Sequence, residues 1–109
     1  MNSRNKGARG ERELAEKLRS RGYDARRGQQ YSGANGDADV VGLPGIHIEC
    51  KRVEKLNIST AMQQSIRDAR KYEVPVVMHR KNGEEWLCTI RLDDFIDILK
   101  RTEINSKLP

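Results

Sequence analysis

The 109-residue sequence lacks the features that define several protein classes. It has only two cysteines, Cys50 and Cys88, and two distant histidines, His47 and His79, so neither a disulfide framework nor a zinc site is indicated. No signal peptide and no apolar run near the roughly 20 residues of a membrane span are present. No repeat or low-complexity tract is found. We therefore expect no membrane attachment, a cytoplasmic location and two reduced thiols in the core.

Apolar residues are also scarce. The hydrophobic fraction is 36%, the aromatic fraction 5% and the charged fraction 34%. A chain of this length and polarity can form one small domain with a modest core, which dimerisation or a bound partner would help to stabilise. The formal charge of +5 and the pI of about 9.5 favour a polyanionic partner, although ordinary solubility also explains a charge of this size.

Residues 36–52 are the most informative stretch. Two short apolar runs, residues 40–41 and 46–48, flank the sequence Gly-Leu-Pro-Gly at residues 42–45, and this pattern predicts an antiparallel hairpin. Successive side chains alternate between the two faces of a strand, so the second arm should have an apolar core face and a polar face. The core face would hold Ile46, Ile48 and Cys50, and the polar face His47, Glu49 and Lys51.

Antiparallel pairing would bring Asp39, at the start of the first arm, beside Glu49. Two close carboxylates repel unless a cation lies between them, and hard oxygen ligands suit Mg²⁺ or Mn²⁺. Lys51 could orient or deprotonate a water, or stabilise a developing negative charge. This set is typical of metal-assisted phosphodiester hydrolysis. The alternative is a solvated polar face with a surface Glu–Lys pair.

The remaining patterns predict helices at residues 7–22, 58–72 and 95–101, and strands at residues 24–30, 74–80 and 85–92. A polar arm at residues 1–6, a polar loop at residues 29–36 and a polar tail at residues 102–109 complete a single domain spanning residues 1–109. The order α-β-β-β-α-β-β-α predicts an α/β fold, in which helices flank a mixed central sheet with the acidic hairpin in its middle.

Each predicted helix has an apolar stripe, and the second and third also have a possible N-cap. The three stripes are Leu14 with Leu18, Met62 with Ile66 and Ala69, and Phe95 with Ile98 and Leu99; the possible caps are Ser59 or Thr60, and Asp93 or Asp94. Glu11 borders the first stripe, where spacing alone favours an i,i+4 salt-bridge partner over a metal ligand. Gln63 could hold a water or a phosphate, but a surface glutamine is at least as plausible.

Together these residues resemble the PD-(D/E)xK nuclease superfamily, and within it the small archaeal-type and phage Holliday junction resolvases. The resemblance covers about residues 6–80. It rests on the Gly-x-x-x-Glu-Arg helix start at residues 7–12, a Ser-Gly loop, Asp39 and the sequence Glu-Cys-Lys at residues 49–51. Ala38 replaces the motif proline, which is a common variation.

The resemblance implies specific roles and partners. Asp39, Glu49 and the backbone carbonyl of Cys50 would bind the metal, with Glu11 completing the acidic site. Lys51 would position or activate the attacking water, and Ser32 would lie near the scissile phosphate. Asp37 competes with Asp39 as the motif acid, but Asp39 is preferred because the apolar strand begins directly after it. Asp37 is then a further ligand or only a turn residue. The protein would be a homodimer that cuts opposed strands of a four-way DNA junction, encoded by a phage or mobile element.

Basic residues would hold DNA phosphates by charge without reading bases. The candidates are Arg4, Lys6, Arg9, Arg26 and Arg52, with Gln63 as a further DNA contact. Two alternatives remain open from the sequence. One is a nuclease of the same fold that acts on duplex, flap or single-stranded DNA. The other is a non-catalytic basic DNA-binding module, with a protein-interaction domain as a weaker third possibility.

Overall fold

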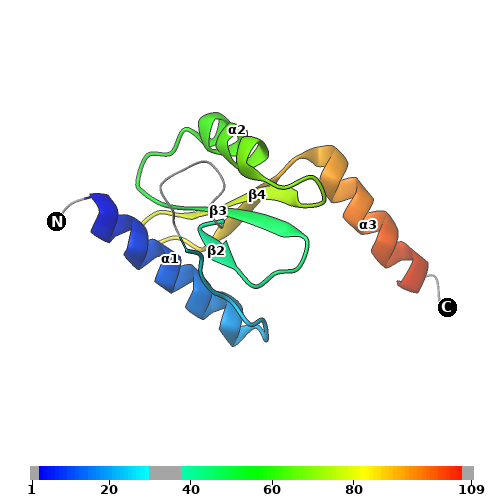
Figure 1. Cartoon of the computed structure of the whole chain (residues 1–109), viewed down its shortest axis with the longest axis horizontal. Helices are drawn as coiled ribbons and strands as arrows, with labels where there is room; N and C mark the ends of the chain where they lie inside the picture. Colours follow the sequence, from blue (N-terminus) through cyan, green and yellow to red (C-terminus); the bar gives the residue numbers. More distant parts are fainter. Residues whose placement is uncertain (1–2, 30–37, 107–109) are drawn as a thin grey trace.

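The computed structural model describes residues 3–29 and 38–106, and the side chains of residues 7–29 and 38–103. The predicted α/β order is confirmed (Figure 1). The elements are α1 (Ser3–Ser20), β1 (Arg26–Arg27), β2 (Val40–Val41), β3 (Ile46–Arg52), α2 (Ile58–Asp68), β4 (Val74–Arg80), β5 (Leu87–Ile90) and α3 (Leu92–Ser106). Within the described ranges, no helix combines the length and apolarity that crossing a membrane requires.

The strands form one mixed sheet in the order β1-β2-β3-β4-β5, with β3 at its centre. β3 and β4 run parallel, and the other neighbours run antiparallel. The parallel pair follows from the crossover through α2, because parallel strands need a long connection. The predicted hairpin is confirmed, since Val40 pairs with Ile48. Its turn places Gly42 at a φ of 123° against the backbone of Asp24, which leaves no space for a side chain.

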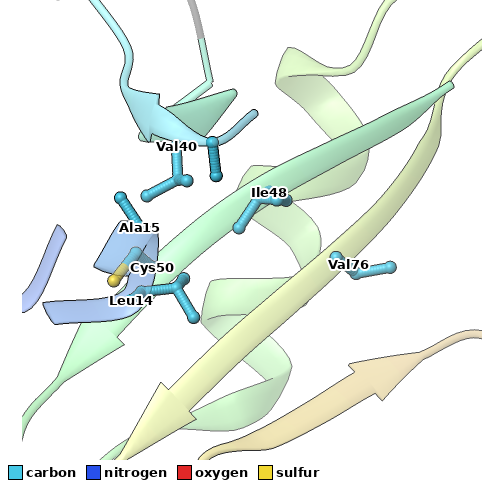
Figure 2. Packing of buried hydrophobic residues seen from close by; sticks show 7 residues of the cluster. Leu14, Ala15, Val40, Ile48, Cys50 and Val76 are labelled. Carbon is cyan, nitrogen blue, oxygen red and sulfur yellow. The ribbon is translucent and has the colours of Figure 1, made fainter. Parts of the chain in front are cut away.

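The main core lies between α1 and one face of the sheet (Figure 2). Its buried residues are Leu14, Ala15, Ala25, Val40, Ile48, Cys50 and Val76. Gly10 allows α1 to approach β3 closely, because a Cβ at this position would lie 2.5 Å from the Cβ of Arg52. The close packing of α1 on β3 therefore explains the glycine at position 10.

The second face of β3 is buried as well, contrary to the expectation that only the Ile48 face carries the core. His47 is 3% exposed and Glu49 is 4% exposed. α2 lies on the opposite side of the sheet from α1 (Figure 1), and the buried Ser65 hydroxyl donates to the carbonyl oxygen of Val76 at 2.9 Å. A central strand between two helices has both faces covered, so alternation of polarity did not predict its burial.

The boundaries of the first two helices differ from the predictions. α1 begins at Ser3, so residues 3–6 of the predicted arm are helical; no proline interrupts them, and Arg and Lys favour helix. α2 ends at Asp68 rather than residue 72. Its N-cap is Asn57, whose side-chain oxygen accepts from the Thr60 N–H at 3.0 Å, rather than Ser59 or Thr60 itself.

The buried stripe of α2 was also predicted wrongly. Ala61 and Ser65 are its buried residues, whereas Ile66 is exposed and Met62 is only half-buried. The small side chains of Ala61 and Ser65 allow the helix to pack close to β3 and β4. The larger Met62 and Ile66 lie at the edges of this contact.

The C-terminal region also corrects several predictions. α3 begins at Leu92, so Asp93 and Asp94 lie in its first turn rather than at the cap. In the first turn their negative charges still interact favourably with the positive end of the helix dipole. The helix continues to Ser106 through most of the predicted polar tail, with the Thr102 hydroxyl donating to the Ile98 carbonyl at 3.0 Å. Cys50 is buried as expected, but Cys88 is exposed.

The strand predicted at residues 24–30 is reduced to the two residues of β1. Ser32, Asp37 and nearly all of the predicted loop fall in residues 30–37, outside the described part of the chain.

Candidate active site

The hairpin holds the carboxylate of Asp39 against β3. The Asp39 N–H donates to the Ile48 carbonyl at 3.1 Å, and the Cys50 N–H donates to Asp39 Oδ2 at 2.9 Å. Backbone groups thus fix both ends of this residue beside Glu49. The predicted proximity of Asp39 and Glu49 is confirmed.

Burial gives the two carboxylates an unusual electrostatic environment. Burial, followed by the charge of Asp39, raises the pKa of Glu49 to about 7. Burial also raises the pKa of Asp39, against the opposing effect of the Cys50 N–H. The Lys51 ammonium lies 3.7 Å from Glu49 Oε2 and favours the ionised form of both acids. Lys51 and the Cys50 N–H therefore offset only part of the cost of ionising Asp39 and Glu49 together.

Glu11, on α1, is close enough to Asp39 for their charges to interact. Burial and the charge of Asp39 raise its pKa, while Arg27 lowers it. The Arg27 Nε donates to Glu11 Oε1 at 3.0 Å. Glu11 does form a salt bridge, but with a residue of β1 rather than with an i,i+4 neighbour on α1.

Two features of this region were not predicted from the sequence. Asp68, at the end of α2, raises the pKa of both Asp39 and Glu49 through its charge. The second is Arg27, whose pairing with Glu11 depends on how β1 lies against α1. Neither interaction has a local sequence signal, because each joins elements that only the folded chain brings together.

Cys50 contacts Asp39 through its backbone N–H, and its thiol lies on the other side, in the core. Its side chain packs in the α1 core (Figure 2), where burial and the charges of Asp39 and Glu11 raise the pKa of the thiol. A thiol in this environment stays protonated and unreactive. The Cys50 N–H donates to Asp39, so the carbonyl oxygen is the backbone group of Cys50 that could hold a metal.

The acidic residues have the right chemistry for a hard cation, since Glu11, Asp39 and Glu49 offer buried or partly buried carboxylates with raised pKa values. In the arrangement described for residues 3–29 and 38–106, however, no three acidic, cysteine or histidine side chains converge as a ready metal cage. Glu11 instead contacts Arg27, and Glu49 contacts Lys51. A metal would have to compete with these ion pairs.

The predicted DNA-binding residues have different surroundings. Arg9, Arg26 and Gln63 are exposed. Arg52 is partly buried, with its Nε 3.4 Å from Glu13 and its Nη1 3.9 Å from Glu54. Glu13 also pairs with Arg80, so Arg52 belongs to an ion-pair network. Arg4 and Lys6 lie in α1, but their side chains are outside the described set.

Comparisons with known proteins agree with the motif. A family model described as phage putative PDDEXK endonuclease matches residues 2–107. The fold is similar to that of Hjc from Archaeoglobus fulgidus, a Holliday junction resolvase from an archaeal hyperthermophile. That match has a TM-score of 0.59 and 25% sequence identity, and covers 78% of this chain and 72% of that chain. No curated protein matches the chain.

The family match covers nearly the whole sequence, including the Asp39–Lys51 motif and the helix that carries Glu11. The similarity to Hjc independently supports a restriction-endonuclease-like sheet flanked by helices. The resemblance inferred from a few residues is thereby confirmed. The chain belongs to the family of phage PDDEXK endonucleases.

Proposed function

We propose that this protein is a divalent-metal-dependent DNA endonuclease that resolves four-way junctions. The observation that carries the proposal is the pairing of the partly buried Asp39 with the buried Glu49, beside Lys51, in a member of an endonuclease family. Burying two adjacent carboxylates is costly unless a cation or hydrogen bonds compensate them. The raised pKa of each acid is consistent with a site built for a positive charge.

Asp39 and Glu49 would hold Mg²⁺ or Mn²⁺ together with the Cys50 carbonyl, and Glu11 would join them by exchanging Arg27 for the cation. A bound divalent cation would supply Lewis-acid stabilisation of the charge on the phosphate and the leaving oxygen. The fixed Cys50 N–H keeps Asp39 oriented, so the chain provides at least one preorganised ligand.

Lys51 would orient the attacking water and stabilise negative charge as the phosphodiester is cleaved. Its side chain is partly exposed and its ammonium lies 3.7 Å from Glu49 Oε2, which supports this role. Ser32 is proposed to lie near the scissile phosphate, as the family resemblance implies.

DNA would be held by phosphate contacts from exposed basic residues, including Arg9 and Arg26, with Arg4, Lys6 and Gln63 as further contacts. Arg52 would contribute only if DNA displaced its ion pair with Glu13. The net charge of +5 supports this mode of binding. Similarity to Hjc, a Holliday junction resolvase, supports the junction as substrate. The protein would act as a homodimer with two sites, as the resemblance to resolvases implies, and the match to a phage family supports action in the cytoplasm of a phage host.

The proposal is tested by incubating labelled four-way junction, matched duplex, flap and single strand with the protein in Mg²⁺. We expect paired, symmetric cuts in the junction only. The Glu49→Ala and Lys51→Ala variants should lose cleavage but bind the junction nearly as tightly as the wild type. Equal cutting of duplex or flap would refute junction resolution while retaining a nuclease. Tight binding with no cutting in Mg²⁺ or Mn²⁺ would indicate a binding module.

A further inference from the structure

α3 carries an apolar stripe that no other described helix or strand covers. Leu92, Phe95, Ile96 and Leu99 recur at the i, i+3, i+4 and i+7 positions of one helix face. Their exposed fractions are 71%, 48%, 37% and 42%. α3 extends away from the sheet rather than packing along it (Figure 1). A contiguous apolar stripe of this kind marks an interaction surface.

The charges beside the stripe restrict what can cover it. Asp93 and Lys100 are seven residues apart, which is close to two helical turns, so both lie on the same side of the stripe. If two copies of α3 packed in parallel, Asp93 and Lys100 of one copy would lie on the opposite side of the interface from those of the other, so no pair between Asp93 and Lys100 would form. If they packed antiparallel about a two-fold axis, each Asp93 would face the partner's Lys100.

We propose that α3 is the self-association surface of this protein, on which α3 of a second copy packs antiparallel. The stripe is self-complementary, and the adjacent charges are matched by the same sequence read in the opposite direction. In this arrangement the Asp93 and Asp94 carboxylates at the start of the helix would also lie near the C-terminal half of the partner helix, which contains Lys100 and Arg101. The helix has 15 residues and is therefore about 22 Å long, enough to bury the whole stripe along its partner.

This inference assigns a surface to the dimer proposed above, but it stands on α3 alone and does not depend on nuclease activity. A sedimentation experiment can therefore fail while cleavage succeeds, and the reverse is also possible. The arrangement leaves β3 and its acidic residues outside the interface, since α3 does not pack along the sheet.

Sedimentation velocity of the full chain over a wide concentration range tests the surface. We expect a wild-type dimer, whereas Phe95→Glu should sediment as a monomer at concentrations at which the wild type is dimeric. Tyr72→Glu is the matched control, because it places the same charge on a different exposed aromatic residue, which is 86% exposed. Far-ultraviolet circular dichroism of each variant checks that the fold is retained. A monomeric wild type, or a dimer that Phe95→Glu leaves intact, would overturn the proposal.

Charge reversal tests the direction of packing. Asp93→Lys and Lys100→Asp should each weaken self-association, because each variant places like charges together in the antiparallel dimer. Mixing the two variants should yield a heterodimer, and the double variant should regain the wild-type dimer. Failure of both the mixture and the double variant to restore the dimer would overturn the antiparallel arrangement.

Discussion

The buried position of Glu49 predicts that this carboxylate destabilises the protein at neutral and alkaline pH when no divalent metal is present. The pKa of Glu49 rises from its ordinary value of 4.5 to about 7, chiefly through burial and the charge of Asp39. The folded state consequently holds this proton more tightly than the unfolded state does. Between these two pKa values the folded state binds more protons, so the free energy of unfolding falls as the pH rises.

The magnitude follows from the same two values. The shift from 4.5 to about 7 corresponds to roughly 3 kcal/mol, at about 1.4 kcal/mol per pH unit. The cost is absent below about pH 4.5 and fully present above about pH 7. Asp39 and Glu11 also have raised pKa values, so their contributions to the pH dependence have the same sign.

Urea unfolding of the wild type and Glu49→Gln in EDTA, from pH 4 to pH 8.5, measures this effect. Glutamine keeps the size and polarity of the side chain but cannot ionise. We expect the stability advantage of Glu49→Gln to grow with pH, by up to about 3 kcal/mol across the range. The control Glu16→Gln changes an exposed carboxylate of the same type on α1 and should show no such trend. A stability difference that stays constant with pH, or that shrinks as the pH rises, would refute the reasoning.

Two further substitutions test the packing that positions the site. Gly10→Ala should lower the free energy of unfolding by about 1–3 kcal/mol in urea denaturation, because the added Cβ would overlap Arg52. The control Gly7→Ala should be neutral or stabilising, because its Cβ would meet no atom within 4 Å. Equal effects of the two substitutions would contradict this explanation. Ser65→Ala should lower the free energy of unfolding by about 1 kcal/mol, because it removes the 2.9 Å hydrogen bond to the Val76 carbonyl. The same substitution at the exposed Ser59 should lower it much less. A neutral Ser65→Ala would show that this hydrogen bond contributes nothing to stability.

The sequence was sufficient to predict the hairpin and the proximity of Asp39 and Glu49. The β-branched arms and the Gly-Pro-containing turn determine the hairpin, and strand pairing then places Asp39 beside Glu49. These interactions are short in sequence separation, so local patterns carry the information. The same pattern did not predict that Glu49 is buried, because burial comes from α2, whose small residues allow it to cover β3.

Contacts between distant elements could not be predicted. Nothing near Asp68 signals that the α2 crossover brings it within electrostatic reach of Asp39 and Glu49. The pair between Arg27 and Glu11 likewise depends on tertiary placement. For α3 the sequence predicted an apolar face correctly in kind, but a single sequence does not distinguish a face that covers its own sheet from one that awaits a second copy.

The central claim is that the carboxylates around Lys51 form a metal-dependent catalytic site. The measurement is single-turnover cleavage of a labelled four-way junction in Mg²⁺ and in EDTA, with the wild type, Glu49→Ala and the exposed-site control Glu16→Ala. We predict cleavage only in Mg²⁺, a loss of about 100-fold or more for Glu49→Ala, and wild-type rates for Glu16→Ala. Cleavage by Glu49→Ala at the wild-type rate, or cleavage by the wild type in EDTA, would contradict the account.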